Sequence, residues 1–337
     1  MSERRVAVLG AGSWGTALAD ALVVNGHDVR IWARDEAVAR EIRERRRNER
    51  YLRHVELATG LDATSDLVDA VGGAGFVLSA CPSHAVREVF VACRDALAAD
   101  AVLISASKGI EIGSDLRMSE VISDVLGDDA RSRIAVLSGP SFADELVRRL
   151  PTAVVAASDP EDAAREVQAL FQNQYLRVYT QTDVAGTELG GACKNVIALA
   201  AGISDGLELG SNARAALITR GLAEITRLAS RLGARETTLA GLAGLGDLVL
   251  TCTGDLSRNR TVGIAIGRGR DPREVVDGME QVVEGVRTTR AAHELGSRLG
   301  VELPITHAVY SILYEGIAPR EALARLMARE PKPERWS

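Results

Sequence analysis

The sequence predicts an α/β domain followed by an all-α domain, and three observations support this fold class. The chain has 337 residues, which exceeds the size of one ordinary domain. Apolar, strand-like runs alternate with helical segments from Val6 to about Asp183. Beyond Asp183 the helical periodicity is almost continuous. We therefore expect domains at residues 1–184 and 185–330, followed by a frayed tail at residues 331–337.

The chain begins with a predicted strand, which is followed by a glycine turn and then by a helix. Val6–Leu9 is apolar, GAGSWG follows from Gly10, and an alanine-rich helical segment runs from Thr16 to about Val24. Gly10 permits a tight turn, Gly12 lets the backbone come close to a pyrophosphate, and Gly15 lets helix and strand pack closely. A plain glycine-rich turn is the alternative, but the strand–turn–helix context favours a Rossmann-type dinucleotide-binding domain.

The second strand, predicted at Val29–Ala33, ends in residues that bear on the cofactor. Sites that prefer NAD place Asp or Glu there, whereas this chain has Arg34 and then Asp35. Because arginine favours a 2′-phosphate, we expect NADP(H) as cofactor, with NAD(H) still accepted through Asp35.

Further strands are predicted where apolar runs end in polar turns. Lys108 follows one such strand, at the edge where open α/β sheets bind ligands. His84 lies in the first turn of a helix and is interpreted as structural or exposed rather than catalytic. Ser141 is interpreted as a helix cap, a ligand contact or both. The predicted strands are Phe76–Ala80, Val102–Ala106, Ile134–Leu137, Pro151–Ala157 and Leu176–Tyr179.

A lysine stands in a segment that is small and apolar on nearly all sides, Thr187–Ile203. Burying an ammonium group without a partner is costly, so Lys194 either extends to water along its stem or has a function. Among the 40 basic residues only Lys108, Lys194 and Lys332 are lysine; the others are arginine. Lysine can lose its proton when burial or a second cation lowers its pKa, and arginine cannot. We therefore expect catalysis from Lys194, and binding and charge stabilisation from Lys108.

Polar groups in the last third are also candidates. Asp247 ends a glycine-rich apolar stretch and needs a cation or a polar ligand, and the run Ser257-Arg258-Asn259-Arg260 is either a surface turn or a phosphate clamp. Glu284 has two possible interpretations, a helix cap or a ligand contact. The helices expected here are Val275–Thr289, Thr289–Leu299, Pro304–Tyr314 and Pro319–Ala328.

Composition disfavours several functional classes. A net charge of −6 argues against nucleic-acid binding, and no run is apolar enough to cross a bilayer. No signal-like segment precedes the first strand, so we expect a cytoplasmic protein. The four cysteines show no paired spacing, and therefore neither a metal site nor a disulfide framework is expected.

These motifs together resemble the bacterial NAD(P)-dependent glycerol-3-phosphate dehydrogenase family over essentially the whole chain. The resemblance implies reversible conversion of dihydroxyacetone phosphate to sn-glycerol 3-phosphate, which supplies the phospholipid backbone. It is compatible with a homodimer. The motifs that carry it are GAGSWGTA from Gly10, SKGIE from Ser107, GPSFA from Gly139, GACKNVIA from Gly191, GLAGLGDL from Gly241, SRNR from Ser257, VVEGV from Val282 and PITHAVYSILYEG from Pro304.

The resemblance also implies site residues, with Lys194 as the proton acceptor. The expected cofactor contacts include the three glycines Gly10, Gly12 and Gly15. The resemblance adds Ser13, Trp14, Arg34, Lys108, Ala143, Arg258, Val282 and Glu284. Lys194 would also contact the substrate. The other substrate contacts would be Lys108, Gly139, Ser141, Asp247, Ser257, Arg258 and Asn259.

One segment, Tyr51–Leu57, departs from the family pattern. The family usually has Pro-Gly after the leucine, where this chain has Arg53-His54, so any cofactor contact from this loop is in question.

The resulting hypothesis is a hydride transfer to a carbonyl carbon with Lys194 as the proton donor and Lys108 stabilising the developing alkoxide. Two alternatives remain. A different β-hydroxyacid dehydrogenase would reject dihydroxyacetone phosphate, and a nonenzymatic NADP(H) sensor would bind the cofactor without turnover.

Overall fold

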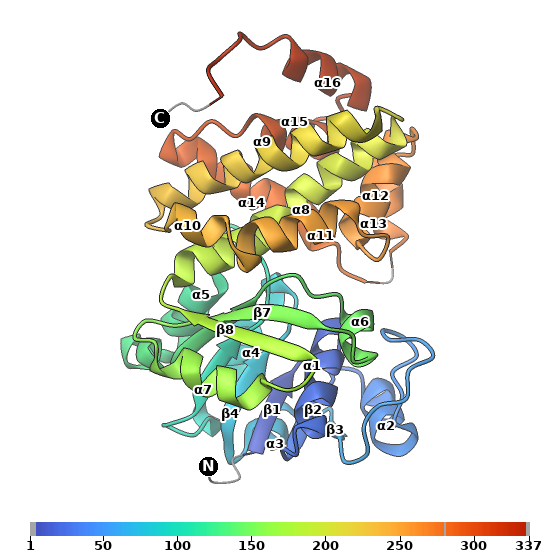
Figure 1. Cartoon of the computed structure of the whole chain (residues 1–337). Helices are drawn as coiled ribbons and strands as arrows, with labels where there is room; N and C mark the ends of the chain where they lie inside the picture. The colour runs from blue at the N-terminus through green and yellow to red at the C-terminus, as the bar shows by residue number, and fades with distance from the viewer. Residues whose placement is uncertain (1–4, 280, 335–337) are drawn as a thin grey trace.

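The computed structural model describes residues 5–279 and 281–334 and confirms the predicted fold class. A sheet flanked by helices forms the lower half of Figure 1, and a helical domain lies above it. In the described residues the sheet has the order β3-β2-β1-β4-β5-β6-β7-β8. The strands are β1 (Arg5–Leu9), β2 (Val29–Trp32), β3 (Asp62–Thr64), β4 (Ala74–Ser79), β5 (Val102–Ser105), β6 (Ile134–Ser138), β7 (Thr152–Ala157) and β8 (Leu176–Gln181).

Neighbouring strands run parallel except at β6 and β7, which pair antiparallel. Helices on both faces bury the sheet, and so β1 is apolar from Val6 to Leu9 and does not alternate. Val6 and Val8 pack into one core, whereas Ala7 and Leu9 pack into the core on the opposite face. The sequence analysis did not predict β3, because three residues with one buried alanine carry no apolar run.

Helices connect the strands of this domain. They are α1 (Ser13–Val24), α2 (Glu36–Arg45), α3 (Leu67–Val71), α4 (Val86–Cys93), α5 (Met118–Leu126), α6 (Ala143–Val147) and α7 (Asp162–Phe171). A 3₁₀ turn, Ser83–Ala85, leads into α4. Helix α1 begins at Ser13 instead of Thr16, because Gly12 is already its N-cap and the glycine turn supplies the first helical residues.

The helical domain is built around α8 (Val184–Gly206). Helices α9, α11, α12 and α14 all pack against α8, which explains why its sequence is apolar on every side. The other helices are α9 (Gly210–Arg231), α10 (Glu236–Leu239), α11 (Asp247–Thr253), α12 (Arg258–Gly267), α13 (Pro272–Asp277), α14 (Glu284–Leu299), α15 (Pro304–Tyr314) and α16 (Pro319–Met327), with a π-helix at Leu242–Gly246.

Two local predictions were wrong. The helix expected over Val275–Thr289 is broken: α13 ends at Asp277 with Gly278 as its C-cap, and α14 begins at Glu284. Ser141 does not cap a helix, because Phe142 is the N-cap of α6 and the Ser141 hydroxyl donates to the Gly139 carbonyl at 2.9 Å.

The two parts of the chain meet just after β8. Asp183 caps α8 by accepting from the Gly186 amide at 2.8 Å, and one turn later Glu188 accepts from the Ser119 amide at 2.8 Å and from Arg117 Nη1 at 2.9 Å. These bonds tie α8 to the start of α5. The exact domain limits at 184 and 330 stay a prediction. No helix in residues 5–279 and 281–334 combines the length and the apolar character needed to span a bilayer.

Candidate active site

The turn Gly10–Gly15, here called the dinucleotide turn, lies at the carboxyl end of β1. Gly10 has φ +110°, and a Cβ there would lie 3.0 Å from the Ala80 carbonyl oxygen. A Cβ on Gly15 would lie 1.9 Å from the Gly10 carbonyl oxygen, which no rearrangement of side chains could relieve. A Cβ on Gly12 would meet nothing within 4 Å. Gly10 and Gly15 therefore shape the turn, while Gly12 keeps an open approach to it.

The start of α1 fits an anionic ligand. Gly12 provides no side-chain cap, and the first turn contains no acidic residue, so the amide groups and the helix dipole face outward uncompensated. Trp14 Nε1 is buried without a hydrogen-bond partner in the described residues. These features fit the pyrophosphate of a dinucleotide.

A second segment of the chain supports this turn from behind. The buried amide of Asn48 donates to the Ala11 carbonyl at 2.9 Å and to Thr16 Oγ1 at 2.8 Å. Ser13 Oγ donates to the Tyr51 carbonyl at 2.7 Å. The sequence analysis missed Asn48, because an asparagine after a charged helix carries no local sign of the distant turn that it holds.

The loop that departs from the family pattern therefore lies against the dinucleotide turn. His54 in this loop adopts φ +63°, a conformation that glycine takes more easily. The Arg50 guanidinium lies 5.4 Å from the centroid of the Tyr51 ring.

The end of β2 separates the two residues that bear on cofactor choice. Asp35 caps α2 by accepting from the Ala37 amide at 2.9 Å, and it also pairs with Arg50 at 3.2 Å. Arg34 is exposed and has no hydrogen bond or ion pair within the described part of the chain. The carboxylate is thus engaged, whereas the guanidinium is available to a ligand.

A charged cluster, here called the lysine cluster, forms at the carboxyl edge of β5 and β6. It consists of Lys108, Lys194, Asp247 and Thr251. Asp247 Oδ2 accepts from Lys108 Nζ at 2.7 Å, and its Oδ1 accepts from Lys194 Nζ. Lys194 Nζ also donates to Thr251 Oγ1 at 2.9 Å. The expectation that Asp247 needs a cation is confirmed, since its fully buried carboxylate lies between two ammonium groups.

The environment of Lys194 favours proton transfer. Its side chain is only 9 % exposed, so the alternative in which it extends to water is wrong. Burial lowers the pKa of Lys194 to about 8, the positive charge of Lys108 adds to this shift, and Asp247 opposes it. An amine with this pKa can both lose and gain a proton near neutral pH.

Glycines let α8 approach the sheet closely enough to form this cluster. A Cβ on Gly191 would lie 2.4 Å from Ser138 Oγ and 3.7 Å from Lys108 Cδ, and a Cβ on Gly190 would lie 2.5 Å from the Ala243 carbonyl oxygen. Ser138 Oγ is buried without a hydrogen-bond partner in the described residues. Gly191 thus lets α8 lie close to the end of β6, and Gly190 lets it lie close to the π-helix that precedes Asp247.

The predicted phosphate clamp is only partly free to bind a ligand. Ser257 caps α12, its hydroxyl accepting from the Arg260 amide at 3.3 Å. Asn259 is buried, and its Oδ1 accepts from the Gly285 amide at 3.0 Å. Arg258 is exposed and donates from Nη1 to the Val282 carbonyl at 3.1 Å. Of the three residues, Arg258 has the most accessible side chain.

Glu284 joins the two domains. Its carboxylate accepts from the Ser83 amide at 3.0 Å and from Ser83 Oγ at 2.7 Å. The cap alternative is wrong, because Val283 is the N-cap of α14 and receives no side-chain cap bond. Ala143, another residue expected at the cofactor, begins α6, which packs against α1.

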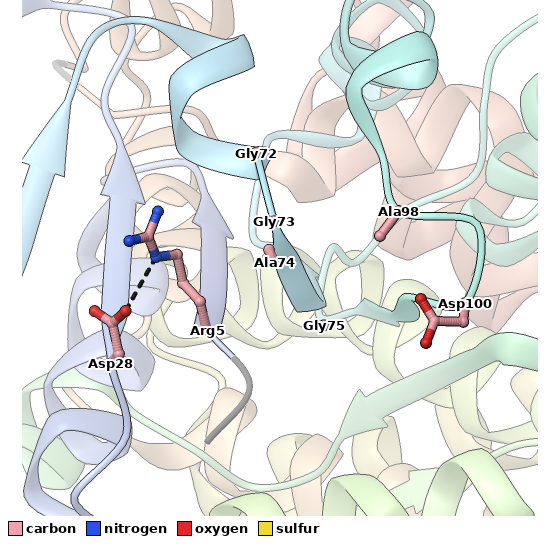
Figure 2. A pocket seen from close by; sticks show the side chains of 8 residues that line it. All are labelled: Arg5, Asp28, Gly72, Gly73, Ala74, Gly75, Ala98 and Asp100. Carbon is pink, nitrogen blue, oxygen red and sulfur yellow. Dashed lines mark hydrogen bonds and ion pairs between the residues drawn. The ribbon is translucent and has the colours of Figure 1, made fainter. Parts of the chain in front are cut away.

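A surface hollow of about 470 Å³ lies at the opposite edge of the sheet (Figure 2). It lies between Arg5, Asp28, Ala98 and Asp100, near the amino ends of β1 and β4. None of the predicted site residues lines it. The predicted chemistry therefore belongs to the carboxyl edge of the sheet.

Known proteins are similar to this chain over nearly its whole length. Family models described as the N-terminus and the C-terminus of NAD-dependent glycerol-3-phosphate dehydrogenase match residues 5–164 and 183–324. The chain is 52 % identical over 334 residues to "Glycerol-3-phosphate dehydrogenase [NAD(P)+]" of Geobacter sp. (strain M21), covering 99 % of each chain. It is 53 % identical over 330 residues to the protein of the same name from Anaeromyxobacter dehalogenans (strain 2CP-C), covering 98 % of this chain and 99 % of that one.

A solved structure is similar over nearly the whole chain. It is the glycerol-3-phosphate dehydrogenase from Coxiella burnetii, with a TM-score of 0.93 and 42 % sequence identity, covering 97 % of this chain and 99 % of that one.

Proposed function

The chain belongs to the NAD-dependent glycerol-3-phosphate dehydrogenase family, and on that premise we propose that it reversibly reduces dihydroxyacetone phosphate to sn-glycerol 3-phosphate. Such a reaction supplies the backbone of glycerophospholipids. The observation that carries the proposal is the lysine cluster, in which Lys194 shares a buried carboxylate with Lys108 at the carboxyl edge of the sheet.

The cofactor supplies a hydride to the C2 carbonyl carbon of the substrate. As negative charge develops on the carbonyl oxygen, Lys194 donates a proton from Nζ to that oxygen, and the C2 hydroxyl results. The lysine cluster carries two ammonium groups and one carboxylate, so its net positive charge stabilises the developing alkoxide before the proton arrives.

In the oxidative direction the roles of Lys194 are reversed. Its neutral amine accepts the proton of the C2 hydroxyl. This neutral form is available because burial lowers the pKa of Lys194 to about 8. Asp247 holds the two lysines at a fixed separation and prevents either ammonium group from being buried unpaired.

The phosphate of the substrate needs cations of its own, because the protein carries a net charge of −6. We assign Arg258 to this role, since a guanidinium can bind phosphate through two hydrogen bonds. We assign the orientation of the substrate beside Lys108 to four further residues. These are Gly139, Ser141, Ser257 and Asn259.

The cofactor assignment is NADP(H), with NAD(H) also accepted. The dinucleotide turn fits the pyrophosphate shared by both, and the exposed Arg34 supports binding of the 2′-phosphate. Ser13, Trp14, Ala143, Val282 and Glu284 complete the proposed cofactor contacts. The cytoplasmic location and the homodimer stay predictions.

The test is a measurement of initial rates by absorbance at the nicotinamide band, with dihydroxyacetone phosphate and either NADPH or NADH. We expect turnover with both cofactors and a higher kcat/KM with NADPH. If dihydroxyacetone phosphate is rejected while a hydroxy acid is oxidised, another β-hydroxyacid dehydrogenase is the correct function. If NADPH binds and no substrate turns over, the protein is a sensor.

A further inference from the structure

Two arginines and one histidine lie on three separate elements at the carboxyl edge of the sheet, the edge that carries the dinucleotide turn. Arg34 follows β2, His84 lies in the 3₁₀ turn after β4, and Arg287 lies in the first turns of α14. β2 and β4 are the two neighbours of β1 in the sheet, so Arg34 and His84 stand on either side of the turn. All three residues are exposed.

Arg287 reaches this region because Glu284 anchors its helix. The Glu284 carboxylate is bonded to the amide and the hydroxyl of Ser83, which directly precedes His84. Residues three apart on a helix share a face, so Arg287 lies one turn along α14 from this anchor and on the same side. The first turn of α14 is thereby placed over the carboxyl edge of the sheet.

The positive charges of both arginines affect the pKa of His84. Burial is the first cause that lowers the pKa of His84, and the positive charges of Arg287 and Arg34 lower it further. Glu284 and Glu88 act in the opposite direction. Position along the chain agrees with this, because Arg34 follows β2 and Arg287 lies one turn after Glu284, whose carboxylate is bonded to Ser83 in the turn after β4.

Neither arginine has a compensating anion among the residues that the structure describes. Within residues 5–279 and 281–334, Arg34 and Arg287 take part in no hydrogen bond or ion pair. Arg290, three residues farther along α14, pairs with Glu294 at 2.8 Å. Two uncompensated guanidinium groups beside the dinucleotide turn in an acidic protein favour an anionic ligand between them.

We propose that Arg287 and Arg34 form an arginine pair that binds the 2′-phosphate of NADP(H) across the two domains. This inference rests on the proposed function and deepens it by adding a residue that determines cofactor specificity. The end of β2 is where the adenosine ribose of a bound dinucleotide lies. A phosphomonoester carries up to two negative charges near neutral pH and can accept hydrogen bonds from two guanidinium groups. NAD(H) lacks this group, so Arg287 distinguishes the two cofactors.

The experiment compares dissociation constants for NADPH and NADH, measured by fluorescence titration, in the wild-type protein and in Arg287→Ala. Loss of charge-assisted hydrogen bonds should weaken NADPH binding about tenfold to a hundredfold and change NADH binding less than about twofold. Arg290→Ala is the matched control, because it removes an exposed arginine of the same helix that already has a partner; both constants should stay unchanged in it.

Competition by nucleotide fragments provides a second measurement. In the wild-type protein, 2′-AMP should displace the reduced cofactor better than 5′-AMP, and Arg287→Ala should remove this preference. Equal weakening of NADPH and NADH would overturn the proposal, because Arg287 would then act on the shared pyrophosphate. Unchanged constants for both cofactors would overturn it as well. If the wild-type protein bound neither cofactor, the proposed function itself would fail.

Discussion

The dinucleotide turn and the lysine cluster lie at the same edge of the sheet and are built in opposite ways. The turn consists of six consecutive residues, and its properties are those of the backbone: positive φ, a missing Cβ and unpaired amide groups. The cluster consists of side chains from the segment after β5, from α8 and from α11, which are far apart in the sequence. One half of the proposed site is therefore local, and the other exists only in the folded chain.

The difference has an energetic consequence. A glycine turn places no charge in the protein interior, and it can form as soon as β1 and α1 pack together. The lysine cluster buries the carboxylate of Asp247 and the ammonium group of Lys194 and partly buries that of Lys108, and burying any of these charges alone would be costly. Their mutual pairing makes the cluster tolerable. We thus expect substitutions in the turn to change cofactor affinity, and substitutions in the cluster to change turnover or stability.

The largest expected effect is on turnover, in Lys194→Met. The proton donor is lost while Lys108 still pairs with Asp247, so the fold should remain intact. We expect kcat to fall about 10²- to 10⁴-fold with little change in the dissociation constant of NADPH. Lys332→Met, in the tail, is the control and should leave kcat unchanged. Equal losses in kcat and cofactor affinity would show that Lys194 is structural.

Asp247→Asn sharpens the energetic side of the comparison. It leaves the buried ammonium group of Lys194 and the partly buried one of Lys108 without their carboxylate, and we expect the free energy of unfolding to fall by about 3–5 kcal/mol near neutral pH. The pKa of Lys194 should fall further, because Asp247 opposes its decrease. The folded variant then binds fewer protons than the unfolded chain, so the loss of stability should be smaller at higher pH. Denaturant unfolding at several pH values measures this; a loss independent of pH would contradict it.

Two alanine substitutions separate the roles of the glycines in the turn. Gly12→Ala adds a methyl group that meets nothing in the free protein, so the melting temperature should stay unchanged while NADPH affinity falls about tenfold or more. Gly15→Ala forces a clash with the Gly10 carbonyl, so both stability and affinity should fall. Thermal unfolding and cofactor titration distinguish the two variants. A destabilised Gly12→Ala would show that the open approach to the turn is misassigned.

The last expected effect is a pH dependence in the unmodified protein, where the change between neighbouring pH values is gradual. Because burial lowers the pKa of Lys194 to about 8, its neutral form becomes scarce below that pH. We expect kcat for glycerol 3-phosphate oxidation to rise about tenfold per pH unit up to about 8 and then level off. The reductive kcat should be level below about 8 and decline above it, because the proton donor is then lost. A profile that is unchanged in Asp247→Asn would argue against Lys194 as the titrating group.

Much of the sheet domain could be predicted from the sequence, because its information is local. The strand–turn–helix order from Val6, the end of the first helix near Val24 and the strand before Lys108 all depend on neighbouring residues. β3 was missed because it is too short to show a pattern. The helix expected over Val275–Thr289 was wrong because its apolar spacing continues through a break that begins at Gly278.

The sequence by itself determined the fold class, the family and the residue types available for chemistry, including the rarity of lysine in an arginine-rich chain. Only the tertiary structure decided that Lys108 and Lys194 share one carboxylate, that Asn48 supports the dinucleotide turn, and that Glu284 links the two domains. The physical reason is the distance along the chain between the residues that interact. Backbone conformation follows from adjacent residues, whereas the pairing of buried charges depends on distances that close packing between α8 and the sheet establishes.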